Sequence, residues 1–150
     1  MSEKFEVSFN SPQCGWMSVG FAAGEKEFHT TTAAAPHKGA LSELLNILTE
    51  SLGTEDFERK LKWNRNPEAF DFVFRKSGKD LTFEIAEFPT ERREISETVF
   101  THSGDSKEIC QAFFTTFQQL YNERNDDEFE QNWHQPFPLK EFEDFSNKLN

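Results

Sequence analysis

The stretch FDFVFRKSGKDLTFEI, residues 70–85, decides the fold of this chain. Apolar side chains occupy alternate positions on both sides of a short turn: Phe70, Phe72, Phe74, Leu81, Phe83 and Ile85. A period of two residues places them on one face of a β-strand and the intervening residues on the other. Ser77, Gly78 and Lys79 supply a tight-turn signal. The stretch therefore predicts an antiparallel hairpin with one apolar face and one polar face.

Further strands are predicted on both sides of this hairpin. Alternating apolar residues or β-branched and aromatic residues mark five other segments: 5–9, 16–22, 27–32, 57–63 and 95–101. Turn signals at 10–13 and at Gly24 separate the first three segments. These three segments predict a hairpin or a short meander in the first part of the chain.

Helices are predicted in the segments between and after these strands. Apolar residues recur every three or four positions in four places: 41–52, 109–121, 129–133 and 139–149. Gly53 follows the first helix as a terminator. Asp105 and Glu108 have the spacing of a capping box ahead of the second helix. Pro138 suits the first position of the last helix, whose buried stripe is expected to include Leu139.

The order of these segments is strands, helix, strands and helices. Strands that follow one another through tight turns indicate an antiparallel sheet with helices collected on one face. We therefore expect one α+β domain over residues 1–150, with a sheet of about five to six strands and helices packed on one face in two layers. The polar face of the sheet would then meet water.

The aromatic residues point to packing more than to recognition. Eighteen of the 150 residues are phenylalanine, against one tyrosine and three tryptophans. Surfaces that read sugars, bases or peptides prefer Tyr and Trp, which carry a hydrogen-bonding group. Burial of a Phe contributes roughly 2–3 kcal/mol, while ordering the backbone costs roughly 1–2 kcal/mol per residue. We expect the core to use nearly all of these rings and to leave no large ligand cavity.

The net charge of −11 restricts the choice of partner. Residues 123–150 are the most acidic part, with eight acidic and three basic side chains. A negative field repels nucleic-acid phosphates and anionic lipids and attracts a basic protein. We expect a basic protein partner, no nucleic acid and no membrane. The alternative is that the acidity only keeps a phenylalanine-rich protein in solution.

Cysteine usage and the absence of apolar runs predict a cytoplasmic protein. Cys14 and Cys110 stand far apart and outside any metal-binding or redox spacing. No charged-then-apolar leader precedes the first strand, and no apolar run approaches the roughly 20 residues of a membrane span. We expect both thiols to be reduced, with Cys110 acting as a small core residue.

Local signatures of catalysis are missing from the sequence. It contains no glycine-rich phosphate loop, no H-E-x-x-H and no G-x-S-x-G. The four histidines show no metal-binding spacing, so we predict no catalytic residue, no metal and no cofactor. The alternative is a small enzyme or ligand-binding domain with a pocket between sheet and helices. Its candidate residues are His29, His37 and His102 with Glu84 or Glu87.

Two places are candidates for binding a protein partner. Glu84 lies on the polar face of the central hairpin together with Asp71 and Arg75, where the alternatives are cross-strand pairing and a surface that receives a partner. An acidic cluster stands beside an aromatic residue further on, and the alternatives are a solvated surface and a docking point for a Lys- or Arg-rich protein. The predicted partner-binding residues are Glu84, Asp126, Asp127, Glu128 and Trp133.

The layout resembles small bacterial proteins of unknown function, including immunity proteins of polymorphic-toxin systems. The resemblance rests on the hairpin around Cys14-Gly15-Trp16, the leucine-rich helix 41–52, the hairpin 70–85 and the segment Trp133-His134-Gln135-Pro136-Phe137-Pro138 before a short amphipathic helix. It covers most of the chain in order and length. It implies a non-enzymatic, acidic, single-domain cytosolic protein that occludes a toxin, and it assigns no functional residue.

Overall fold

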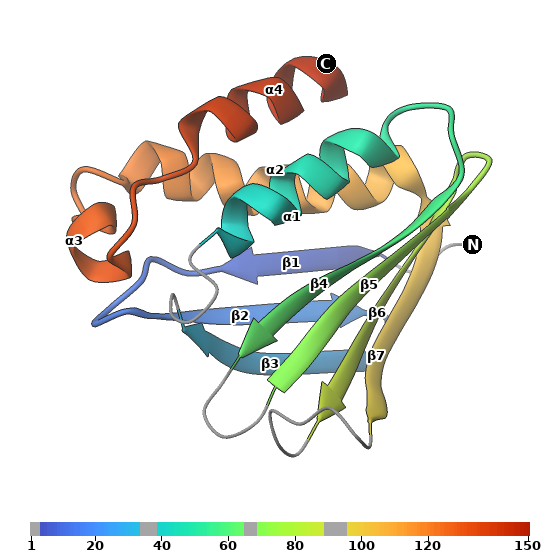
Figure 1. Cartoon of the computed structure of the whole chain (residues 1–150), viewed down its shortest axis with the longest axis horizontal. Helices are drawn as coiled ribbons and strands as arrows, with labels where there is room; N and C mark the ends of the chain where they lie inside the picture. Colours follow the sequence, from blue (N-terminus) through green and yellow to red (C-terminus); the bar gives the residue numbers. More distant parts are fainter. Residues whose placement is uncertain (1–3, 34–38, 65–68, 89–95) are drawn as a thin grey trace.

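A computed structural model describes residues 4–33, 39–64, 69–88 and 96–150 of the chain (Figure 1). Seven strands and four helices occur in this part of the chain: β1 (Phe5–Phe9), β2 (Trp16–Ala23), β3 (Lys26–Ala33), α1 (Ala40–Ser51), β4 (Phe57–Asn64), β5 (Ala69–Ser77), β6 (Asp80–Phe88), β7 (Glu97–Asp105), α2 (Ser106–Glu123), α3 (Phe129–Trp133) and α4 (Leu139–Leu149). The predicted α+β class is confirmed.

The strands form two antiparallel sheets, so the expectation of a single sheet of about five to six strands is wrong. One sheet has the order β1-β2-β3 and the other has the order β4-β5-β6-β7. Every pairing is between strands that follow one another along the chain. The helix α1 lies between β3 and β4 in the sequence and separates the strands of the two sheets. The apolar face of each sheet is buried by the other sheet and the helices.

The central hairpin forms as its pattern predicts. β5 and β6 pair with Phe72 opposite Ile85 and Phe74 opposite Phe83. Gly78 in the turn has a φ of +61°, a conformation that glycine adopts without steric cost. The hairpin therefore presents its phenylalanines to the interior as one continuous surface.

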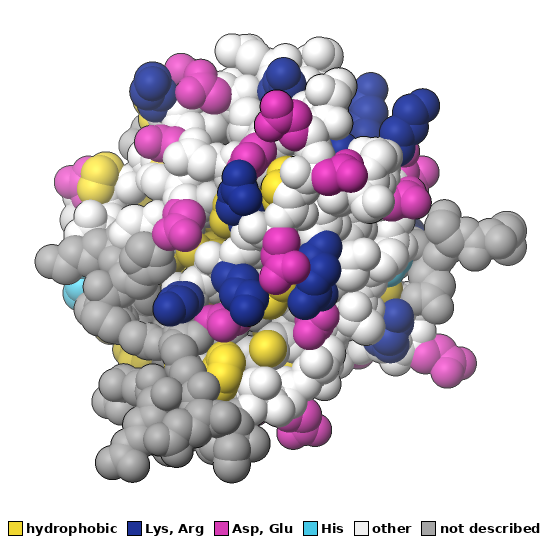
Figure 2. All heavy atoms as spheres, turned by 45° about the vertical axis from the view of Figure 1, so that its right-hand side comes forward, with side chains coloured by type: hydrophobic (Ala, Val, Ile, Leu, Met, Phe, Trp, Pro, Cys, Tyr) yellow, Lys and Arg dark blue, Asp and Glu magenta, His cyan; other side chains and the backbone are white. Residues whose placement is uncertain are grey.

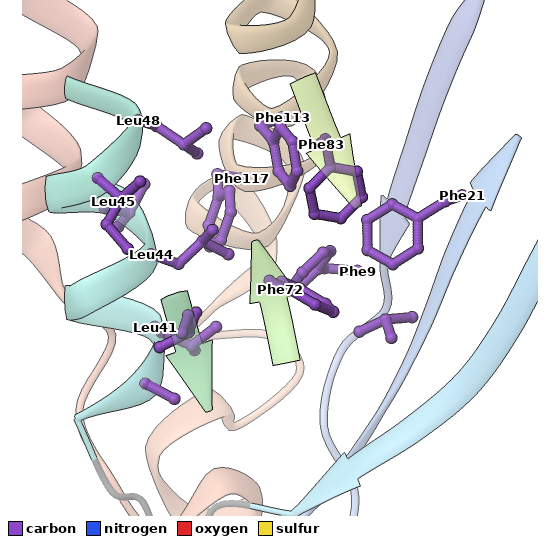
Figure 3. Packing of buried hydrophobic residues seen from close by; sticks show 14 of the residues in the cluster. Phe9, Phe21, Leu41, Leu44, Leu45, Leu48, Phe72, Phe83, Phe113 and Phe117 are labelled. Carbon is purple, nitrogen blue, oxygen red and sulfur yellow. The ribbon is translucent and has the colours of Figure 1, made fainter. Parts of the chain in front are cut away.

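The core lies where the two sheets and α2 meet (Figure 3). The ring of Phe83 in β6 lies 5.1 Å from that of Phe21 in β2 and 5.7 Å from that of Phe113 in α2, measured between centroids. Phe72 meets Phe21 edge-on at 5.4 Å. Aromatic contacts of this kind add roughly 0.5–1.5 kcal/mol beyond area burial. Contacts between phenylalanine rings thus join the two sheets and α2.

Helices cover one side of this arrangement, and no helix of the described ranges lies on the outer face of the four-stranded sheet (Figure 1). β3 contacts both β4 and β7, while α2 runs beside β1, and α4 packs on α1 and α2.

The predicted cap of α2 is confirmed, because the Asp105 carboxylate accepts hydrogen bonds from the backbone N–H groups of Lys107 at 2.9 Å and Glu108 at 3.4 Å. None of the helices in the described ranges has the length and apolar character needed to cross a membrane.

Candidate partner-binding surface

The predicted partner-binding residues fall in two separate places. Glu84 lies in the middle of β6, on the bare face of the four-stranded sheet. Asp126, Asp127 and Glu128 lie in the turn between α2 and α3, and Trp133 ends α3. Figure 1 shows α3 beside the β1–β2 turn, away from the middle of β6. The two places are therefore described in turn.

The bare face of the four-stranded sheet, called here the outer sheet face, carries side chains of both charges (Figure 2). The register of the four strands assigns these residues to it: Glu58, Lys60, Lys62, Asp71, Val73, Arg75, Thr82, Glu84, Ala86, Thr98, Thr101 and Ser103. Thr82 and Ser103 join their hydroxyl groups at 2.8 Å across β6 and β7. Opposite charges at neighbouring positions on adjacent strands favour internal pairing.

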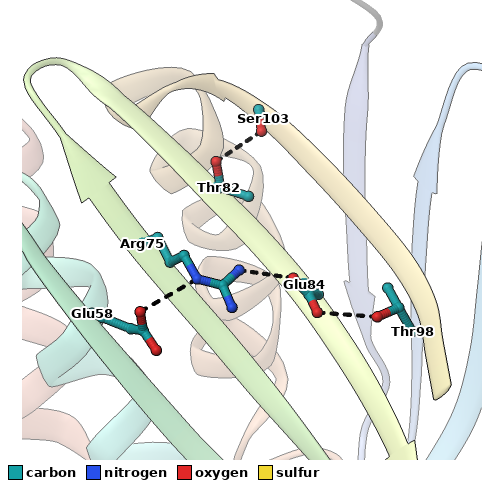
Figure 4. Close-up of polar contacts among 6 residues, drawn as sticks. All are labelled: Glu58, Arg75, Thr82, Glu84, Thr98 and Ser103. Atoms are coloured by element: carbon teal, nitrogen blue, oxygen red, sulfur yellow. Dashed lines mark hydrogen bonds and ion pairs between the residues drawn. The ribbon is translucent and has the colours of Figure 1, made fainter. Parts of the chain in front are cut away.

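Glu84 is held in a polar network within this face (Figure 4). Arg75 donates from Nη1 to Oε2 of Glu84 at 2.8 Å, and Thr98 donates from Oγ1 to Oε1 of the same carboxylate at 3.1 Å. Arg75 Nε also lies 3.4 Å from Oε2 of Glu58. The hydrogen bond from Arg75 lowers the pKa of Glu84 below 4.5 despite partial burial, and the same bond raises the pKa of Arg75.

This network confirms the cross-strand pairing of Arg75 with Glu84. A partner that used the Glu84 carboxylate would have to compete with two hydrogen bonds that the protein already makes. The role of Glu84 in binding stays a prediction. The carboxylates of the second place, the turn between α2 and α3, make fewer hydrogen bonds with the residues that the structure describes.

The turn between α2 and α3 is fixed by backbone and side-chain hydrogen bonds. The N–H of Phe129 donates to the carbonyl of Arg124 at 2.8 Å, and Asn132 Nδ2 donates to the carbonyls of Asp127 and Glu128 at 3.1 and 3.2 Å. Glu128 has a φ of +51°, which is uncommon for a residue with a side chain. The turn is therefore built by local pairing and projects its acidic side chains outward.

The β1–β2 turn packs against α3 from the other side. Ser11 Oγ donates to Oδ2 of Asp127 at 2.6 Å, and the N–H of Gly15 donates to the carbonyl of Asn132 at 2.5 Å. A side chain at Gly15 would come within 3.2 Å of the His134 ring. The three acidic residues of the predicted cluster, Asp126, Asp127 and Glu128, are all exposed, and Asp127 has a side-chain partner in Ser11.

Beside this turn the surface is hollowed, and the depression is called here the α3 hollow. Its volume is about 360 Å³, and its walls come from the α2–α3 turn, α3, the segment between α3 and α4, and the start of α4: Arg124, Asn125, Glu128, Phe129, Glu130, Gln131, Pro136, Phe137 and Leu139. Phe129, Phe137 and Leu139 line the hollow together with Glu128 and Glu130. Apolar and acidic groups are therefore available within one concave surface.

Leu139 gives this surface an exposed apolar side chain. It is 42% exposed, although the helical stripe of α4 predicted it to be buried, because it stands in the first turn of α4 at the mouth of the hollow. A second hollow of about 330 Å³ lies beside the first and shares Pro136, Phe137 and Leu139 with it. The segment Pro136–Leu139 is therefore a ridge with a depression on each side.

The residues that line the α3 hollow carry a net negative charge. Glu128 and Glu130 are both exposed, and each contributes one carboxylate. Arg124 is the basic residue of the lining; it donates to the carbonyl of Tyr121, lies 4.0 Å from the centroid of the Tyr121 ring, and keeps its positive charge. The two carboxylates therefore outnumber one guanidinium in this lining. The arrangement suits a cation with an aliphatic stem.

Trp133 is a core residue in the structure. It is 1% exposed, and its place facing the interior follows from its spacing of four residues from the buried Phe129. The aromatic contact beside the acidic turn is supplied instead by Phe137, which the sequence analysis did not single out. The signal was the pair Pro136 and Pro138, since prolines on both sides keep Phe137 out of a helix.

The two described histidines of the alternative enzymatic hypothesis, His29 and His102, do not form a common site. His29 lies on the outer face of the three-stranded sheet and pairs with Glu27. His102 is 8% exposed and stacks on Phe5 inside the protein at 4.8 Å between centroids, and His37 falls outside the described residues. In the part of the chain that the structure describes, no three His, Cys, Asp or Glu side chains are grouped as metal ligands.

Known proteins offer no guide to this surface: no protein-family model matches the chain, and no curated protein or solved structure matches it significantly. The geometry of the surface therefore carries the argument for function.

Proposed function

We propose that this chain is a non-enzymatic protein-binding domain that receives a lysine or arginine side chain of a basic partner in the α3 hollow. The observation that supports this is the combination of an exposed Leu139 and the ring of Phe137 with the carboxylates of Glu128 and Glu130 around one depression. Long basic side chains bury an aliphatic stem on apolar surface while their charged end meets carboxylates.

The net charge of the protein supports the same class of partner. A charge of −11 accelerates the approach of a basic protein and makes the encounter sensitive to salt. The partner that we propose is a toxin with a cationic surface, such as a nuclease, which this protein would occlude as an immunity protein. This choice rests on the acidity and on the resemblance in layout.

The experiment uses the purified protein and the product of the adjacent reading frame as its candidate partner. Binding is titrated at low and at high salt for the wild-type protein and for Glu130→Lys and Leu139→Ala. We expect each substitution to weaken binding at least about tenfold, because each removes a complementary group from the centre of the contact.

Glu25→Lys is the matched control, because it makes the same charge change at an exposed position in the β2–β3 turn. Equal weakening by Glu25→Lys and Glu130→Lys would show that only the overall charge matters and would contradict the α3 hollow. If the candidate does not bind, immobilised protein is used to capture partners from native lysate at low salt. The proposal fails if no basic protein is retained.

A further inference from the structure

The edge of β1 is open to a second kind of interaction, which does not involve the α3 hollow. Among the strands of the described ranges, β1 is an edge strand, because it pairs with β2 on one side only. The N–H of Asn10 donates to the carbonyl of Ser18 in β2, so every second residue of β1 turns its backbone groups toward β2. The backbone groups of Phe5, Val7 and Phe9 therefore point to the free edge.

A threonine of α2 closes this edge at Phe9. Thr116 Oγ1 accepts from the N–H of Phe9 at 2.7 Å and donates to the carbonyl of Phe9 at 3.3 Å. One side chain thus takes both hydrogen bonds that a neighbouring strand would make at this position. The pair is buried, so Phe9 is not available to any other strand.

At Val7, two residues before Phe9 in β1, no side chain of α2 closes the edge in this way. β1 and α2 run side by side in the same direction (Figure 1). Two residues of a strand advance about 7 Å and four residues of a helix about 6 Å, so the position opposite Val7 is Ala112. The side chain of alanine has no hydrogen-bonding group, so it cannot pair with the backbone of Val7 as Thr116 pairs with that of Phe9. Among the described residues, no group outside β2 hydrogen-bonds to the backbone of Val7 or Phe5.

These backbone groups face a groove that has room for a further chain. The groove has a volume of about 450 Å³ and lies between β1 and α2, where it is lined by Lys4, Phe5, Glu6 and Val7 of the strand side and by Glu108, Gln111, Ala112 and Thr115 of the helix side. Exposed edges of this kind are templates for strand addition.

The charges of the groove select the occupant. Lys4 is paired with Glu6 at 3.5 Å, while the carboxylate of Glu108 forms no ion pair with any residue that the structure describes. Gln111 and Thr115 are exposed beside it. We propose that an extended segment of another protein, carrying a lysine or arginine that meets Glu108, adds to the edge of β1 and pairs with the backbone of Val7 and Phe5.

The probe is the acetylated and amidated hexapeptide Thr-Lys-Val-Lys-Val-Thr, and the readout is hydrogen exchange of backbone amides by NMR. Without peptide, the amide of Phe9 should exchange more slowly than that of Val7. With saturating peptide, exchange at Val7 should slow by about tenfold, because a protected amide exchanges only when the pairing opens. The same peptide N-methylated at every residue should give no protection, since its methyl groups stand between the two strands and keep its carbonyls away from the N–H of Val7.

A variant distinguishes the groove from the rest of the surface. Ala112→Thr should protect Val7 without peptide, as Thr116 protects Phe9, and should weaken peptide binding at least about tenfold. Ala86→Thr on the outer sheet face is the control and should leave binding unchanged.

Two results would overturn the proposal. One is equal protection of Val7 by the peptide and its N-methylated form, or no protection by either. The other is protection that rises with protein concentration in the absence of peptide, which would identify a second copy of this chain as the occupant. Neither result bears on the α3 hollow, whose variants lie on other elements.

Discussion

Replacement of Thr116 by valine tests the closure of β1 by α2. Valine has nearly the shape of threonine and a similar helix propensity, so the substitution removes the hydroxyl group without opening a cavity. The buried N–H of Phe9 then loses its acceptor at 2.7 Å and its carbonyl loses a donor at 3.3 Å. A buried donor left without a partner costs about 1–3 kcal/mol, and we expect Thr116→Val to lower the free energy of unfolding by about 2 kcal/mol.

Urea unfolding measures this change directly. At a slope of about 2 kcal/mol per molar, the midpoint should fall by about 1 M with an unchanged slope. Thr115→Val is the matched control, because Thr115 is exposed and its hydroxyl donates only to the carbonyl of Gln111 in its own helix, at 3.0 Å. A midpoint for Thr116→Val within the error of the control would refute the assignment of Thr116 as the group that satisfies the edge of β1.

Two further predictions concern titratable groups. The pKa of Glu84 is lowered from 4.5 in the folded protein, so its network stabilises the protein above pH 4.5, and this stability is lost as the pH falls through the folded-state pKa. The urea midpoint of the wild-type protein should therefore fall more steeply in acid than that of Glu84→Gln. Equal dependence of the two midpoints on pH would contradict the network. Burial raises the pKa of the Cys110 thiol from 9.0 to about 12. The stability that the protonated, buried thiol contributes to the folded protein is therefore complete below pH 9.0 and is lost as the pH rises toward 12. At pH 8 an aromatic disulfide reagent should modify the exposed Cys14 quickly and Cys110 only in denaturant, and two fast thiols in the folded protein would be the opposing result.

Local patterns predicted the elements of this protein well, because each depends on the periodicity of neighbouring residues. The phenylalanines of β5 and β6 alternate, and the leucines of α1 recur at helical spacing, so both elements were visible in the sequence. The division into two sheets was not predictable in this way. Alternation shows which side of a strand is buried, but it does not show whether β3 pairs with β4 or faces it.

The candidate surface was predicted in part for a related reason. The acidic turn at 126–128 was visible as a run of charges, whereas the hollow beside it depends on where Phe137 and Leu139 come to lie. Trp133 was expected on the surface, but a tryptophan next to acidic residues is equally compatible with an inward position. The open edge at Val7 required the register of β1 against α2, which depends on contacts more than 100 positions apart in the sequence.

The bond between Ser11 and Asp127 spans 116 positions, and it holds the N-terminal turn against the support of the α3 hollow. During synthesis the ribosome releases the first of these residues long before the second. A nascent chain can make this bond only after α2 and the turn that follows it have emerged, so the α2–α3 turn gains its support from the N-terminal part of the chain late in synthesis.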